Sequence, residues 1–142
     1  MLNAVLDSTV LISAFLNPTG ISADLLRMAQ GGAFTLCLAD EILDETQRVL
    51  VEYPRIRKRY HYPDEAVIEY AGLLRILSHL VTGLPKIRAV IRDPNDDMIL
   101  ACAIKAKAAY VVSRDKDLLD LHTYRRVEII SPEDFIALLR ND

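Results

Sequence analysis

The stretch from Asp93 to Leu118, DPNDDMILACAIKAKAAYVVSRDKDL, contains one complete unit of the fold that the sequence predicts. Asp93 followed by Pro94 is the pattern of a helix N-cap and first turn, and the apolar spacing after it predicts a helix to about Lys107. The apolar run at 110–113 then predicts a strand, with Asp115 just beyond its end. A helix that leads into a strand with an acid at its carboxyl end is typical of α/β proteins.

The rest of the chain continues this alternation. Apolar runs predict further strands at 4–6, 34–38, 80–82 and 127–130, and helical spacing predicts helices at 22–30, 40–52, 64–77 and from Ser131 onward, with a helical turn at 117–121. Residues 10–16 fit either a strand or a helix. The chain of 142 residues has the length of one domain. We therefore expect residues 1–142 to form a single three-layer α/β/α domain around a mostly parallel sheet, with a ligand site at the carboxyl ends of the strands.

Composition excludes several classes of protein. The chain is 51% hydrophobic and 26% charged, which is typical of a globular protein, and its net charge of −3 excludes a uniformly basic nucleic-acid coat. Two cysteines, Cys37 and Cys102, lack the number and spacing of a disulfide scaffold or a structural zinc site. The sequence has no signal-peptide pattern and no run of about 18 apolar residues. We expect a cytoplasmic protein that does not span a membrane.

A basic segment lies in the middle of the chain. Residues 54–92 contain eight bases against three acids, although the flanking segments are acidic. Within it, the run PRIRKRYHYP at 54–63 alternates cations with tyrosines, and such a run can bind phosphates and stack on bases. A solvated surface connection is the other interpretation. The candidate nucleic-acid-binding residues are Arg55, Arg57, Lys58 and Arg59.

Two acids follow predicted strands. Asp7 comes directly after the strand 4–6, and Asp115 lies two residues beyond the strand 110–113. Because the carboxyl ends of parallel strands meet at one edge of a sheet, we expect both side chains at that edge. A strand-end aspartate is also a common turn or cap residue, so each has that second interpretation.

Two further acids are placed by helical geometry. The residues three, four and seven positions after Asp97 are apolar, which predicts that its carboxylate points into the protein. Glu45 lies about 40° outside the apolar stripe of its helix, so it either reaches a site beside the sheet or extends to water. Asp93 and Asp96 are explained by capping and by the helix dipole.

The residue types in this group favour a hard metal ion. An inward-pointing carboxylate needs a compensating cation, and no lysine or arginine is obviously placed to supply one. Oxygen ligands without histidine or cysteine select Mg²⁺ or Mn²⁺ over zinc. The sequence also lacks a phosphate-cradling glycine loop and a nucleophile elbow. Cations held by carboxylates activate water and stabilise an in-line phosphoryl displacement.

Four motifs occur in a recognisable order over nearly the whole chain: VLDSTVLI at 5–12, EILDET at 41–46, DPNDD at 93–97 and VVSRDKDL at 111–118. In this order and spacing they resemble the PIN-domain family, and particularly its toxin branch in prokaryotic toxin–antitoxin systems. The resemblance implies a compact α/β/α fold and an endoribonuclease that uses Mg²⁺ or Mn²⁺ to hydrolyse RNA. It also implies a small antitoxin as a partner, and a homodimer.

The resemblance assigns roles by position. The catalytic and metal-binding quartet would be Asp7, Glu45, Asp97 and Asp115, and the supporting residues would be Ser8, Asp93, Asp96, Ser113 and Asp117. Two places have a rival, Asp96 for Asp97 and Glu41 for Glu45, and at a third Asp117 would share the role of Asp115.

Two other functions stay open at this stage. The first is a catalytically silent PIN-like module that acts through an antitoxin or another protein partner. The second is a phosphatase with Asp7 as the nucleophile. A site of the haloacid-dehalogenase type needs a second aspartate two positions on, where this chain has Thr9.

Overall fold

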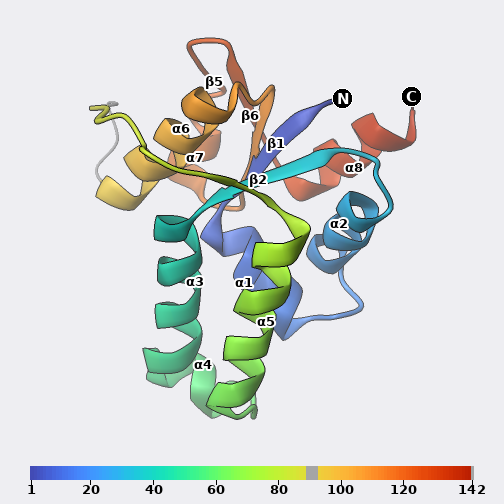
Figure 1. The fold of residues 1–142 in the computed structure, drawn as a ribbon. Coiled ribbons are helices and arrows are strands. Elements are labelled where there is room, and N and C mark those ends of the chain that lie inside the picture. The colour runs from blue at the N-terminus through green and yellow to red at the C-terminus, as the bar shows by residue number, and fades with distance from the viewer. Residues whose placement is uncertain (89–92, 142) are drawn as a thin grey trace.

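The computed structural model of the chain describes residues 1–88 and 93–141 (Figure 1). In these residues there are six strands and eight helices. In chain order they are β1 (Asn3–Leu6), α1 (Ser8–Leu16), α2 (Ile21–Gln30), β2 (Thr35–Ala39), α3 (Asp40–Glu52), α4 (Pro54–Arg59), α5 (Asp64–Leu77), β3 (His79–Val81), α6 (Pro94–Ala106), β4 (Tyr110–Val112), α7 (Lys116–Leu119), β5 (Thr123–Tyr124), β6 (Val127–Ile130) and α8 (Pro132–Arg140).

The strands form one sheet in the order β3-β2-β1-β4-β6-β5. Every neighbouring pair is parallel except β5 and β6, which are antiparallel. Val5 at the centre lies opposite Cys37 on one side and Val111 on the other. The predicted α/β class and the mostly parallel sheet are therefore confirmed.

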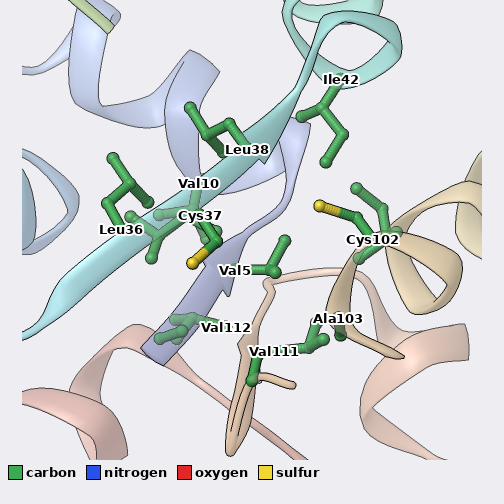
Figure 2. Close-up of a cluster of buried hydrophobic side chains, with 14 of the residues drawn as sticks. Val5, Val10, Leu36, Cys37, Leu38, Ile42, Cys102, Ala103, Val111 and Val112 are labelled. Atoms are coloured by element: carbon green, nitrogen blue, oxygen red, sulfur yellow. The ribbon is translucent and has the colours of Figure 1, made fainter. Parts of the chain in front are cut away.

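One face of the sheet packs against α6. Because side chains alternate along a strand, Val5, Cys37 and Val111 point to the same face. Figure 2 shows Cys102 and Ala103 of α6 beside Val5 and Val111. All five residues are fully buried. The α6 layer thus covers the central strands.

The opposite face is covered by helices from both ends of the chain. Phe135 of α8 packs edge-on against Phe34, at 5.0 Å between ring centroids, and in a tilted orientation against Tyr110 of β4, at 5.6 Å. Helix α8 also contacts α2, and the two lie on the same side of the molecule in Figure 1. Helices on both faces make the three layers that the sequence predicts.

The structure settles one open assignment and adds two elements that the sequence does not predict. Residues 10–16 belong to helix α1, because Asp7 caps that helix as soon as β1 ends. Residues 54–59 of the basic run form a short helix, α4, with no buried residue. The strand β5 is an addition that two residues of sequence cannot predict. Among the described residues, no single helix is long and apolar enough to cross a membrane. Helices α1 and α2 together have the length and apolar composition of a membrane span, but the chain bends by 101° between them.

Candidate active site

Asp7 lies between the end of β1 and the start of α1, and both its backbone and its side chain form hydrogen bonds there. Its backbone N–H donates to the carbonyl of Val112 at 3.1 Å, which continues the sheet by one residue. Its Oδ1 accepts from the Val10 N–H at 3.2 Å and from the Thr9 hydroxyl at 2.5 Å, and its Oδ2 accepts from the Ser113 hydroxyl. The side chain is therefore a helix cap and the centre of a buried hydrogen-bond network.

The turn after β4 is joined to Asp7 through the same hydroxyl groups. Ser113 Oγ accepts from the Asp115 N–H at 2.9 Å, and Thr9 Oγ1 accepts from the Arg114 N–H at 3.0 Å. Asp115 then caps α7, since its side chain accepts from the Asp117 N–H at 2.9 Å. Two strand ends that are more than a hundred residues apart in the chain are thus fixed against each other.

Asp96 brings a second buried acid to this edge of the sheet, after Asp7. It lies in the first turn of α6 and is 5% exposed, and its Oδ2 has no hydrogen-bond partner. A buried carboxylate oxygen without a donor is costly unless a cation or a proton satisfies it. Asp96 is therefore the more deeply buried of the two neighbouring acids, Asp96 and Asp97.

The spacing favours Asp97 as the inward-pointing acid, whereas the structure buries Asp96 more deeply, and the difference has a physical reason. Helix α6 is buried on almost every side over residues 99–103, so apolar neighbours follow Asp96 as well as Asp97. Spacing alone cannot distinguish the two positions. Asp97 is half-buried and lines a hollow of about 380 Å³, together with Glu41 and Lys86.

The acids at this edge repel one another and are poorly solvated. Burial raises the pKa of Asp7 to about 6, against the lowering effect of its hydrogen bonds, and the charge of Asp115 adds to the rise. Burial also raises the pKa of Asp96 to about 7, with further contributions from the charge of Asp115, from a hydrogen bond that protonated Asp96 donates to Asp115, and from the charges of Asp93 and Asp7. In the part of the chain that the structure describes, no lysine or arginine forms a salt bridge with these buried acids.

These residues suit a divalent cation. One carboxylate oxygen from each of Asp96, Asp115 and Asp117 lies within 4.8 Å of the others. The donors are all oxygen atoms, which favours Mg²⁺ or Mn²⁺. The partnerless Oδ2 of Asp96 gives a second reason for the fit, because a bound cation would satisfy it.

Other predicted site residues lie outside this group of three acids. Glu45 forms an ion pair with Arg48 at 2.8 Å, and its side chain is 15% exposed. Asp93 is exposed and caps α6 by accepting from the Asn95 N–H. Ser8 is the first residue of α1 and is half-buried. Glu41 is exposed near the start of α3.

The helix α4, which begins the basic run at 54–63, lies away from the sheet edge, at the far end of the α3 and α5 pair (Figure 1). Arg57 is part of the fold there. Its guanidinium pairs with Asp64 at 2.7 Å, donates to the carbonyls of Leu50 and Tyr62, and lies 4.7 Å from the centre of the Tyr62 ring. Arg55, Lys58 and Arg59 are exposed on α4.

Sequence reasoning missed Thr9. Its hydroxyl donates to Asp7 and accepts from the backbone of residue 114, so it connects both halves of the site. A hydroxyl residue two positions after a strand-end aspartate is the signal that was available.

Two comparisons with known proteins found a similar family and a similar fold. A family model described as "PIN domain" matches residues 3–117. Among solved structures, the crystal structure of VapBC2 from Rickettsia felis bound to a DNA fragment from their promoter contains a chain that superposes with a TM-score of 0.60. The sequences are 12% identical, and the match covers 92% of this chain and 98% of the other, so the likeness shows the fold alone. No protein with a curated description matches the sequence.

Proposed function

The chain belongs to the PIN domain family, and on that premise we propose that it is a metal-dependent endoribonuclease, the toxin component of a toxin–antitoxin system. PIN domains are generally nucleases. The observation that carries the proposal is the buried Asp96 carboxylate, whose Oδ2 lacks a partner beside Asp115 and Asp117. An acid that is buried without a donor is expected where a cation belongs.

Asp96, Asp115 and Asp117 would hold the cation, and Asp7 would complete the site. When bound, Mg²⁺ or Mn²⁺ supplies Lewis-acid chemistry, which activates water and neutralises charge on a phosphodiester. The Oδ1 of Asp7 accepts from both Thr9 and Val10, whereas its Oδ2 accepts from Ser113 alone, so Oδ2 is the oxygen with a lone pair that would remain for the cation. Ser113 orients that oxygen, and its hydroxyl also fixes the backbone of Asp115. A role for Glu45, for Asp97 or for the half-buried Ser8 stays a prediction.

The partner is proposed from the fold and the family together. The similar solved chain comes from VapBC2, a complex bound to promoter DNA. By analogy we infer a small antitoxin for this chain, as well as homodimer formation and a cytoplasmic location. Co-purification with a small protein encoded beside this chain is the observation that supports the antitoxin. Purification of the chain alone, at full activity and from cells that express both genes, would contradict it.

Cleavage of fluorescent single-stranded RNA by the purified chain tests the proposal. We expect cutting with Mg²⁺ or Mn²⁺, none with EDTA, and a loss of more than about 100-fold in Asp7→Asn. Asp44→Asn is the matched control, because Asp44 is exposed on α3. Equal cutting by the wild type and Asp7→Asn would identify a contaminating ribonuclease and reject the assignment. Mn²⁺ binding without any cutting would favour the silent binding module.

A further inference from the structure

A hollow of about 350 Å³ lies at the C-terminal end of α1, away from the acidic site. Its walls combine aromatic rings with a cation and come from two segments of the chain. They include Phe15, Leu16, Arg59, Tyr60, His61 and Tyr62, and none of the residues that line it is acidic. Its size is that of a small ligand pocket, and its chemistry suits a flat, electron-rich ring next to a negative charge.

One wall of the hollow is rigid. The Tyr62 hydroxyl donates to the Leu50 carbonyl at 2.7 Å, and the Arg57 guanidinium covers the Tyr62 ring. Phe15 packs edge-on against Tyr62 at 5.0 Å between centroids and also contacts the ring of Tyr70. These contacts fix the rings of Phe15 and Tyr62 within the fold.

Tyr60 is held less tightly. It is half-buried, and among the described residues its ring has one cation or ring neighbour, the guanidinium of Arg59 at 5.7 Å. Arg59 is exposed and forms no salt bridge in the described part of the chain. A ring with an exposed cation beside it is the arrangement that stacks on a base and contacts its phosphate.

Helix α1 connects this hollow to the acidic site. Asp7 caps one end of α1, and Leu16 at the other end lines the hollow. At 1.5 Å per residue, nine residues separate them by about 13 Å along the helix axis. Thr9, Ser13 and Leu16 fall on the partly exposed side of α1, whereas its buried residues lie on the other side. One partly exposed helix face therefore runs from the acids to the aromatic rings.

We propose that this hollow is a nucleobase subsite, in which Tyr60 stacks on a base of single-stranded RNA and Arg59 contacts an adjacent phosphate. The inference rests on the proposed function, because the same strand places another of its phosphates at Asp7 and Asp96. The exposed cations Arg55 and Lys58 on α4 add electrostatic attraction for the strand. The subsite binds a nucleotide distant from the bond that is cut.

Binding and cleavage are measured separately to test it. The first measurement is the fluorescence anisotropy of a labelled single-stranded RNA of about 12 nucleotides, titrated with the full chain in EDTA so that no cutting occurs. We expect Tyr60→Ala to raise Kd by about 5- to 100-fold, the range for loss of one base–aromatic stack, and Tyr60→Phe to retain wild-type Kd. Unchanged Kd in Tyr60→Ala would overturn the proposal, whatever the result of the cleavage assay.

Tyr53→Ala is the matched control. Tyr53 is 44% exposed and also lies beside an arginine, with Arg48 at 5.8 Å from its ring, but it does not line the hollow. The Tyr53→Ala variant should bind RNA with the wild-type Kd. An equal rise in Kd in Tyr53→Ala and Tyr60→Ala would show that any exposed tyrosine contributes to binding, and it would reject the subsite. If Tyr60→Ala melts at a lower temperature, Arg59→Ala replaces it, because Arg59 is exposed.

The second measurement is kinetic. For the 12-nucleotide RNA with Mn²⁺, Tyr60→Ala should raise KM and leave kcat unchanged, because the base is bound away from the reacting bond. A dinucleotide is too short to occupy both places, so its cleavage should not change. Equal loss on both substrates would show that Tyr60 acts on the acidic site and would contradict the subsite. Failure of the wild type to cut any RNA would reject the proposed function without altering the Kd result.

Discussion

Asp7 is a buried carboxylate whose charged form is disfavoured although the fold surrounds it with hydrogen-bond donors. Three donors surround it, yet burial still raises its pKa to about 6. Asp96 is in a worse position, since one of its oxygens has no donor and its pKa rises to about 7. At neutral pH, without a cation, these residues weaken the folded state because the unfolded chain ionises them more easily.

Stability without metal should therefore fall as the pH rises. Below about pH 4 both acids are protonated in the folded and the unfolded chain, and their contribution to stability is fully present. Between about pH 4 and pH 7 the unfolded state releases these protons first, so the free energy of unfolding decreases. Thermal melting in EDTA across this range measures the effect. Asp7→Asn should flatten the curve, and a wild-type curve that rises steadily over this range would contradict the assignment.

Asp96→Asn and Asp97→Asn make a matched pair of neighbours on α6. The first removes a buried acid from the group with Asp115 and Asp117, so we expect cleavage to fall by more than about 100-fold. The second changes a half-buried side chain and should retain most of the activity. Rates measured with Mn²⁺ on one RNA decide the matter. A larger loss in Asp97→Asn would return the role to that residue.

The helices α3, α4 and α5 form a projection, and the contacts of Arg57 hold its end together. The arginine contacts the end of α3 through Leu50, the start of α5 through Asp64, and the loop between α4 and α5 through Tyr62. Such a guanidinium, with several acceptors and an aromatic ring, is a structural group and not a free cation. The contacts of Arg57 also hold the rigid wall of the nucleobase subsite.

Arg57→Ala should accordingly lower the free energy of unfolding by about 1–3 kcal/mol, because several carbonyls lose a charged donor. Lys58→Ala, its exposed neighbour, should stay within about 0.5 kcal/mol of the wild type. Urea denaturation of the two variants provides the comparison. Equal stability of both would show that the Arg57 contacts contribute little. Arg57→Lys should not restore stability, since a lysine cannot reproduce the planar contacts.

Local patterns predict most of these elements but not all of them. The strand β4 and the helix α6 are predicted correctly because an apolar run and an Asp-Pro cap are local signals. The helix α4 is stabilised by the tertiary partners of Arg57, which a reading of neighbouring residues cannot supply. His122 and Arg125, which flank β5, have left-handed backbone, and their residue types do not predict that conformation. The choice between Asp96 and Asp97 fails for a similar reason, because α6 is buried on nearly every side.

For the molecule as a whole, the predicted class and sheet are confirmed, whereas the single-domain assignment for residues 1–142 stays a prediction. Alternating apolar runs and caps are enough to predict an α/β/α arrangement. The convergence of Asp7, Asp96 and Asp115 required the sheet order, in which β1 and β4 are neighbours. Asp7 and Asp115 are far apart in the chain, and they come close in space because these two strands are neighbours in the sheet.

A cation that binds only the folded chain should stabilise the whole molecule. We expect Mn²⁺ to raise the free energy of unfolding by about 2.7 kcal/mol when its free concentration is about 100 times Kd. The increase should be small or absent in Asp96→Asn. Melting temperatures with EDTA and with increasing Mn²⁺ give the result. An equal rise in the wild type and Asp96→Asn would place the ion elsewhere.

The two cysteines lie in the α6-covered layer of the core and have a practical consequence. Cys37 and Cys102 are both fully buried, and burial raises the pKa of both thiols, that of Cys102 to about 12. Thiol reagents attack the deprotonated form, so these residues are shielded by position and by chemistry. The sequence has no other cysteine. The rate at which a chromogenic disulfide reagent labels the native chain should therefore report how fast the central sheet opens.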